Sequence, residues 1–207
     1  MVSDRYGVTM GNREELIAGA KRCLIEKGFA RTTARDIASA SGVSLAAIGY
    51  HFGSKDALMM QALYELIGEW GEELERALTE NGAPARDPAR RFESIWDRTI
   101  ESFGGSAHGL WAAQLELPSL LGHNEELRAF LASVQPEAAA GLAELFLGID
   151  QEKDPETART AGSVLHALLI GMMVKWFMDP KQAPSGPELA QGIRLIADRM
   201  AAGPART

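Results

Sequence analysis

The sequence predicts an all-α protein of about nine helices, with a small helical head at the N-terminus and a larger helical domain behind it. Apolar residues recur with helical spacing along almost all of the 207 residues, and the alternation typical of strands is nearly absent. Asp-Pro pairs, a Gly-Gly pair and single prolines divide this pattern into separate helices. We place the domain boundary after residue 57, so that residues 1–57 form the head and residues 58–207 the second domain.

The first helix is expected to begin at Asn12 and to end at Gly28. Asn12 and Glu15 have the spacing of a capping box, and glycine is a common C-terminal stop. The apolar face of this helix consists of Leu16, Ile17, Ala20, Cys23 and Leu24.

The next two helices are short and are joined by a tight turn. Thr33 and Asp36 cap the second helix, and Ser44 caps a third that runs through His51. The turn at 41–43 contains Gly42, which adopts a positive φ at low cost. Two short helices joined in this way form a helix-turn-helix, here about residues 33–52, whose second helix can enter the major groove of DNA.

The fourth helix is capped by Ser54, has Lys55 as its first residue and continues to about Leu78. Its apolar stripe has the period of a helix. The stripe consists of Leu58, Ala62, Leu63, Leu66, Ile67, Trp70, Leu74 and Leu78.

Five further helices follow a loop at 81–84. Asp-Pro pairs at 87–88 and 154–155 each supply an N-cap followed by proline in the first turn. Pro118 is expected to end the sixth helix, and Pro136 to interrupt or kink the seventh. The expected ranges are 88–103, 108–117, 124–147, 155–178 and 187–201, with a frayed tail at 203–207.

Composition favours a cytoplasmic protein. The charge distribution indicates that only the head could bind a polyanion such as DNA. The formal net charge is −7, yet residues 1–57 carry 8 Lys and Arg against 6 Asp and Glu. Cys23 is the only cysteine, which excludes an intramolecular disulfide; we expect it to be a small buried residue, with a reactive thiol as the alternative. The N-terminal residues lack the pattern of a signal peptide, and the apolar run at 164–174 is too short to span a membrane.

The stretch FARTTARDIASASGVSLAAIGYHFGSKDAL resembles the DNA-binding domain of the TetR/AcrR family of bacterial transcriptional regulators. The match covers about residues 12–65. It rests on Gly28-Phe29, Thr32-Thr33, Asp36-Ile37-Ala38, Gly42-Val43-Ser44, Tyr50-His51-Phe52 and Ser54-Lys55-Asp56-Ala57-Leu58.

Four polar or aromatic residues of the head are expected near DNA phosphates. Lys55 lies in the first turn of a helix, where the backbone N–H groups already favour an anion. Thr33 is first a helix cap, and its hydroxyl lies near the duplex backbone as a second possibility. The resemblance implies that Tyr50 and His51 approach phosphates, and partial core packing is the alternative for Tyr50.

The recognition helix departs from the family pattern. Many members have Gly-Thr-Leu-Tyr where this chain has Ala-Ala-Ile-Gly at 46–49. Most of its side chains offer only apolar contact to thymine methyl groups, or close backbone approach at Gly49. The DNA contacts expected from this helix and its cap are Ser44, Leu45, Ala46, Ala47 and Gly49.

Arg35, in the first turn of the second helix, is our candidate for a principal polar base contact. It is the only long bidentate donor nearby in the motif. The equally weighted alternative is a phosphate contact, or a solvent-facing partner for Asp36.

The second domain is rich in aromatic and methionine residues at helical spacing, which are either core or the lining of a cavity. The resemblance implies an effector pocket here, whose occupation moves the fourth helix and the DNA-reading heads. His108 and Glu116 are further polar candidates. The expected lining is Trp70, Trp96, Thr99, Phe103, Trp111, Gln114, His166 and Met173.

No catalytic motif or metal-ligand spacing occurs, so we expect neither an enzyme nor a cofactor or metal. The eighth and ninth helices are expected to form a homodimer interface, or else to be interior to one subunit. Small residues such as Gly162 and Gly171 permit close approach, and the resemblance favours two helices from each protomer. A two-fold dimer places its recognition helices about 34–36 Å apart or a multiple of that, which predicts an inverted-repeat operator.

These features together predict a homodimeric, ligand-responsive transcriptional repressor that a small, largely apolar effector releases from double-stranded DNA. One alternative is an all-helical small-molecule-binding protein or enzyme that retains the head without using it. Another is an activator, or a regulator controlled by a protein partner.

Overall fold

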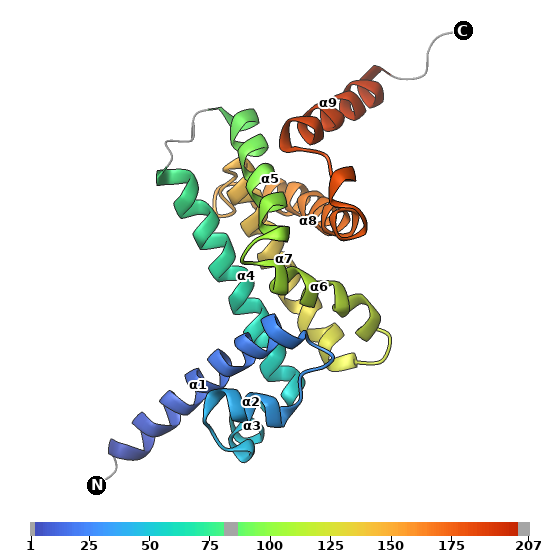
Figure 1. Cartoon of the computed structure of the whole chain (residues 1–207). Helices are drawn as coiled ribbons and strands as arrows, with labels where there is room; N and C mark the ends of the chain where they lie inside the picture. The colour runs from blue at the N-terminus through green and yellow to red at the C-terminus, as the bar shows by residue number, and fades with distance from the viewer. Residues whose placement is uncertain (1–2, 81–86, 203–207) are drawn as a thin grey trace. The chain divides into compact units, whose positions relative to one another are not determined.

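The computed structural model describes residues 3–80 and 87–202, and there the predicted all-α fold is confirmed. These residues form nine α-helices and one short 3-10 helix, with no strand among them (Figure 1). The expected loop at 81–84 and the tail at 203–207 lie outside the described residues. The elements are α1 Ser3–Lys27, α2 Ala34–Ser41, α3 Leu45–Phe52, α4 Lys55–Glu80, α5 Pro88–Gly104, α6 His108–Leu120, α7 Glu125–Leu147, α8 Pro155–Met178, η1 Pro180–Gln182 and α9 Gly186–Ala202.

The chain packs as two compact units, each built from two stretches of sequence. The first unit comprises Met1–Glu72 and Ser106–Val134, and the second comprises Glu73–Gly105 and Gln135–Thr207. Both α4 and α7 therefore contribute to both units. Because this division concerns packing alone, the functional boundary after residue 57 stays a prediction.

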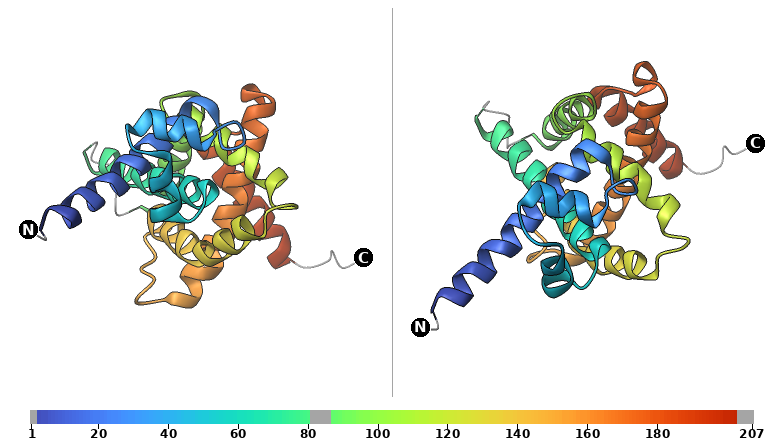
Figure 2. Two further views of the ribbon diagram at one scale, coloured as in Figure 1. Left: turned by 90° about the horizontal axis from the view of Figure 1, so that it is seen from below. Right: turned by 60° about the horizontal axis from the view of Figure 1, so that its bottom comes forward.

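The core of the first unit joins the helix-turn-helix to α6 and α7. The predicted apolar face of α1 is buried, including Cys23, and it packs with Ile37 of α2 and Ile48 of α3. Leu117 of α6 and Leu127 of α7 belong to the same buried cluster. Figure 2 shows α1, α2 and α3 from below, gathered at the first turns of α4. Each fully buried Leu or Ile side chain stabilises the fold by about 1.5–3 kcal/mol, so α6 contributes to holding the head together.

The start of α1 was predicted wrongly. This helix begins at Ser3, so Asn12 and Glu15 lie inside it and do not form a capping box at its end. No proline lies between Ser3 and Asn12, so the backbone hydrogen-bond ladder can extend across the whole segment. A capping-box spacing is a local signal that does not by itself prevent a helix from continuing upstream.

Pro118, predicted to end a helix, and Pro136, predicted to interrupt or kink one, both lie inside helices, so the predicted stop and the predicted interruption were wrong, and a kink at Pro136 stays a prediction. α6 continues two residues beyond Pro118 to Leu120, and α7 is continuous across Pro136. Proline removes a single N–H donor, and the neighbouring turns keep their own bonds. Buried side chains on either side, Leu117 in α6 and Phe146 in α7, hold these helices in place through packing. The boundary between the two units nevertheless falls beside Pro136.

The second unit is built around the aromatic face of α5. Trp96 lies 4.8 Å from Phe146 of α7, and Phe103 lies 6.0 Å from Trp176 of α8, measured between ring centroids. Asp97 of α5 accepts a hydrogen bond of 2.6 Å from the backbone N–H of Gly186, at the start of α9. Aromatic packing thus joins α5 to α7 and α8, and a polar contact joins it to α9.

Among the described helices, α8 alone is long and apolar enough to cross a membrane by length and composition. The sequence expectation counted only the uninterrupted run at 164–174, whereas the whole helix has 24 residues. A single helix of this kind is weak support for a membrane span, because helices of soluble proteins pass the same test. Only 22% of its most apolar window is buried, so much of this apolar surface faces outward.

Candidate nucleic-acid interface

The N-terminus of α2 is held by a capping box, as predicted. The Thr33 hydroxyl accepts a hydrogen bond from the backbone N–H of Asp36, and the Asp36 carboxylate accepts one of 2.8 Å from the backbone N–H of Thr33. Lys27, at the end of α1, pairs with the same carboxylate at 2.6 Å. The hydrogen bond from Lys27, and then those from Thr33, hold the pKa of Asp36 well below its usual range. Asp36 is therefore an ionised bridge between α1 and α2.

The turn between α2 and α3 is also as predicted. Gly42 adopts a φ of 72°, and its N–H donates to the carbonyl of Ala38 at 3.0 Å. Val43 and Ile48 are buried on either side of the start of α3. This arrangement turns the opposite face of α3 outward.

The outward face of α3 is largely apolar. Leu45 is 48% exposed, and Ala46 and Gly49 are also exposed. Ala47 is half-buried, and no other part of the described chain lies within 4 Å of a Cβ placed on Gly49. Gly49 thus leaves open space through which another backbone can approach closely.

Ser44 occupies the N-cap position of α3, but its side chain makes no capping hydrogen bond. The expectation of a side-chain cap was therefore wrong for Ser44. Its φ of −63° and ψ of 145° place the residue at the helix entry, and its carbonyl accepts a hydrogen bond of 3.0 Å from the backbone N–H of Ala47. The exposed hydroxyl is not used in holding the helix.

Tyr50 and His51 lie at the end of the recognition helix. The Tyr50 side chain is 78% exposed, which excludes the alternative of core packing, and its ring meets that of His51 edge-on at 4.9 Å. His51 is half-buried. An exposed phenol beside an imidazole provides polar donors of the kind that contact phosphates.

Lys55 lies in the first turn of α4, where Ser54 accepts a capping hydrogen bond of 3.0 Å from Ala57. The ammonium group of Lys55 pairs with Asp56 at 2.8 Å and lies 5.3 Å from the centre of the Phe29 ring. These contacts hold the charge close to the positive end of the helix.

Arg35 is exposed on α2 and forms no ion pair among residues 3–80 and 87–202. The carboxylate of Asp36 is engaged by Lys27 and Thr33, so it is not the partner of Arg35. A base contact and a phosphate contact remain the two alternatives for this guanidinium.

The residues expected to line an effector pocket are divided between the two units. In the first unit, the Trp70 and Trp111 rings meet edge-on at 4.8 Å, and Gln114 is half-buried. In the second unit, Thr99 is buried and donates to the Ile95 carbonyl at 2.8 Å, and burial lowers the pKa of the half-buried His166. Trp96, Phe103 and Met173 are buried there too. The effector pocket stays a prediction.

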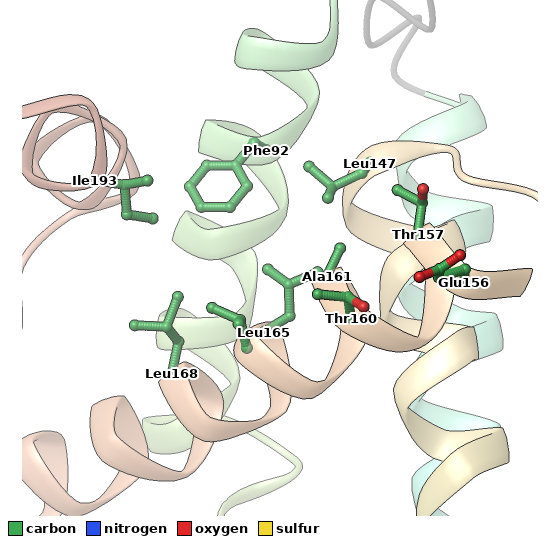
Figure 3. A pocket seen from close by; sticks show the side chains of 10 residues that line it. Phe92, Leu147, Glu156, Thr157, Thr160, Ala161, Leu165, Leu168 and Ile193 are labelled. Atoms are coloured by element: carbon green, nitrogen blue, oxygen red, sulfur yellow. The ribbon is translucent and has the colours of Figure 1, made fainter. Parts of the chain in front are cut away.

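A different set of residues lines an open groove of about 540 Å³ in the second unit (Figure 3). Phe92 of α5 and Ile193 of α9 face a row of α8 side chains that includes Leu165 and Leu168. None of the expected effector residues lines this groove. In the described part of the chain, no group of three His, Cys, Asp or Glu side chains could hold a metal ion.

The sequence did not reveal three contacts that α6 and the start of α7 make with the segments flanking the helix-turn-helix. Glu116 of α6 accepts a hydrogen bond from the backbone of Ala30, and Asn124 donates one to Asp56. Glu126 of α7 accepts hydrogen bonds of 3.4 Å from the Ser54 hydroxyl. Residues so far apart in the sequence leave no local pattern that could have revealed these pairs.

Known proteins with similar sequences and structures are transcriptional regulators. Residues 16–62 match the family model described as bacterial regulatory proteins, tetR family. The HTH-type transcriptional regulator BetI of Stenotrophomonas maltophilia is 30% identical over 56% of this chain and 61% of its own length. The HTH-type transcriptional repressor AcnR of Corynebacterium efficiens is 34% identical over 35% of this chain and 37% of its own. The chain thus matches less than two thirds of the length of either relative.

The fold is shared over nearly the whole chain with a solved structure, that of the multidrug binding protein EbrR complexed with imidazole. The TM-score is 0.57 and the identity 25%, covering 94% of this chain and 92% of that one. The matched region at 16–62 contains the capped, glycine-turned helix pair described above. Residues 16–62 of this chain are thus similar to the tetR family of bacterial regulatory proteins.

Proposed function

We propose that this protein is a cytoplasmic, homodimeric transcriptional repressor that binds an inverted-repeat operator through residues 1–57. The observation that carries the proposal is the outward face of α3, which the core leaves exposed, directly before the N-terminus of α4. An outward second helix of this motif is suited to the major groove. The excess of Lys and Arg over Asp and Glu in residues 1–57 suits a phosphate backbone.

The protein would recognise the base sequence of its operator through few polar side chains. Leu45 and Ala46 offer apolar contact to thymine methyl groups, and the open space at Gly49 allows the DNA to approach the helix closely. Arg35 is the proposed polar base contact. Lys55 and Tyr50 fix the register on phosphates, with Thr33, Ser44, Ala47 and His51 completing the interface.

The homodimer is proposed to form through α8 and α9, which expose rows of large apolar side chains. On α8, Val164 is 58% exposed and Val174 40% exposed; on α9, Leu195 is 57%, Ile196 62% and Met200 79% exposed. Several large apolar side chains exposed on the same two helices are typical of an interaction site. A second copy would cover it by the same patch on both subunits.

Regulation by an effector is proposed for residues 58–207. The relatives support the two elements separately, because AcnR is named a repressor and EbrR a multidrug binding protein. The aromatic and methionine residues of both units fit a small, largely apolar effector. Nothing in this function requires catalysis, and the relatives are named regulators.

Fluorescence anisotropy against duplexes tiled across the protein's own upstream region, at two salt concentrations, tests the proposal. We expect saturable binding to one inverted repeat that survives competitor DNA. Only weak, steeply salt-dependent binding to every duplex would contradict it and would favour the helical small-molecule-binding alternative.

Arg35→Ala tests the proposed base contact in the same assay. Losing a bidentate base contact costs about 1–3 kcal/mol and relaxes the preference at one base position. Arg90→Ala, which removes an exposed arginine of α5, is the control and should leave binding unchanged. A uniform loss over all sequences would assign Arg35 to a phosphate instead.

A further inference from the structure

The helix-turn-helix of α2 and α3 is joined to the rest of the first unit at two places. We call residues 28–33, between α1 and α2, the first joint, and residues 53–56, between α3 and the first turn of α4, the second joint. The two joints carry Thr33 and Lys55, two residues proposed to contact phosphates. The distance and angle between these residues therefore depend on how the joints are held.

Glu116 of α6 holds the first joint. Its Oε2 accepts a hydrogen bond of 2.7 Å from the backbone N–H of Ala30. Its Oε1 lies so close to Gly28 that a Cβ on Gly28 would collide with it, and Gly28 has a φ of 82°. Two turns earlier in α6, Gly109 lies directly against the backbone of Ile25. The helix is therefore in close contact with the end of α1 and with the loop that follows.

Asn124, directly before α7, holds the second joint. Its Nδ2 donates a hydrogen bond of 2.9 Å to Oδ2 of Asp56, whose other oxygen pairs with Lys55 at 2.8 Å. The Oδ1 of Asn124 accepts a bond of 2.9 Å from the backbone N–H of Leu127 and so caps α7. One amide side chain thus links the start of α7 to the residue that pairs with Lys55.

Both contacts come from a single corner, residues 116–126, where α6 passes into α7. The corner is itself cross-linked, because Arg128 donates a 2.6 Å hydrogen bond to the carbonyl of Leu121. It is anchored in the core of the head by the buried side chains of Leu117 and Leu127. A cross-linked and anchored segment can hold two joints at a constant separation.

We propose that the α6–α7 corner is a clamp that holds both joints of the helix-turn-helix and thereby sets the spacing of its phosphate contacts. Glu116 and Asn124 are positioning residues, since neither is proposed to touch DNA. The inference rests on the proposed DNA-binding function. A movement of α6 or of the start of α7 would reach both ends of the recognition motif through these two side chains.

Three variants of the full-length protein separate the clamp from general effects of charge. Glu116→Ala removes the acceptor at the first joint. Asn124→Asp keeps the oxygen that caps α7 but places a carboxylate against Asp56. Glu72→Ala is the control for Glu116→Ala, because it makes the same charge change at an exposed residue of the first unit, far along α4 from Lys55 and outside the corner.

Amide hydrogen exchange of the free protein is the first measurement, and it does not depend on DNA. We expect the Ala30 amide to exchange at least about tenfold faster in Glu116→Ala, and residues 54–57 to exchange faster in Asn124→Asp. Glu72→Ala should match the wild type at both joints. Unchanged exchange in both clamp variants would overturn the proposal.

Operator affinity is the second measurement. We expect each clamp variant to bind about tenfold more weakly, with Glu116→Ala keeping the salt dependence of the wild type because no phosphate contact is lost. The double variant Asp56→Asn/Asn124→Asp has the wild-type net charge and a restored donor–acceptor pair, so it should recover most of the affinity lost in Asn124→Asp. Affinities equal to that of Glu72→Ala would overturn the clamp. If the wild type binds no duplex, the proposed function fails, and exchange at the joints still decides whether the clamp exists.

Discussion

The two units both expose large apolar side chains, but in different arrangements. In the first unit, Leu45 and Tyr50 stand on the short helix α3, within a segment that has more Lys and Arg than Asp and Glu. In the second unit, exposed apolar residues extend along α8 and α9, from Val164 to Met178 and from Leu195 to Met200. A few apolar groups among cationic and polar ones suit the methyl groups and phosphates of DNA, whereas many large apolar side chains exposed along two helices suit another protein surface.

The contrast shows that the partner of an exposed apolar residue can be inferred only together with the charged and polar residues around it. Polar links such as those of Lys21 to Glu65 and Glu69 fix helices of the first unit in direction as well as distance. Burial alone would lower the pKa of Lys21, but the hydrogen bonds to these two carboxylates outweigh it and raise the pKa. The second unit relies more on aromatic packing and close backbone approach, as at Gly162 against Ala139.

The largest effect is expected from Gly162→Ala, on the inner side of α8. A Cβ there would collide with the backbone carbonyl of Ala139, which cannot rotate away as a side chain can. We expect a loss of about 3 kcal/mol in the free energy of unfolding, measured by urea denaturation at a fixed protein concentration. Gly141→Ala, on α7 and outside the proposed dimer interface, is the matched control, because the space around Gly141 is open. It should be neutral or stabilising by up to about 1 kcal/mol, and equal losses in the two variants would show that α8 has no closed inner side.

Ile196→Asp and Leu45→Asp test whether the two exposed surfaces serve different partners. We expect Ile196→Asp to weaken dimerisation by about 2 kcal/mol, or thirtyfold, because it places an unpaired carboxylate in the proposed interface. Sedimentation over a range of concentrations measures this. Leu45→Asp should dimerise like the wild type and lose operator binding, since it puts a negative charge next to the duplex. A dimer weakened equally by both changes would contradict the division of roles.

Gly28→Ala, compared with Gly42→Ala, sharpens the description of the first unit. Both glycines have a positive φ, so each change costs about 1–2 kcal/mol through the backbone alone. Only at Gly28 does the added methyl group also collide with Glu116. The unfolding free energy should therefore fall further in Gly28→Ala, and equal losses would mean that Glu116 does not press on the first joint.

The smallest effect is a pH dependence that arises in the second unit. Burial lowers the pKa of His166 in the folded protein, so the unfolded chain binds the proton more tightly. This contribution is fully present above the unfolded pKa of about 6.5 and is lost as pH falls through the folded value. Urea unfolding at several pH values should show a smaller loss on acidification in His166→Asn than in the wild type. The same dependence of the unfolding free energy on pH in both proteins would contradict a role of His166.

Most helix ends were predictable because their causes are local. Thr33, Asp87 and Asp154 each accept hydrogen bonds from N–H groups two or three residues ahead, and Gly42 takes the conformation that the turn requires. The start of α1 and the passage of α6 beyond Pro118 were not predicted, because continuing a helix depends on the turns and packing around such a signal. The sequence was sufficient to predict the all-α fold class and the similarity of its N-terminal region to the tetR family.

The sequence by itself determined which segments become helices, where most of them are capped, and which face of α3 turns away from the core. These properties depend on hydrogen bonds and apolar spacing within a few residues. Only the tertiary structure decided what holds the recognition motif in place. Glu116 reaches Ala30 across 86 residues of sequence, and Asn124 reaches Asp56 across 68. Such pairs are brought together by the packing of α6 and α7 on the head, and the physical reason is that contact in a folded chain is set by the shared core rather than by distance along the sequence.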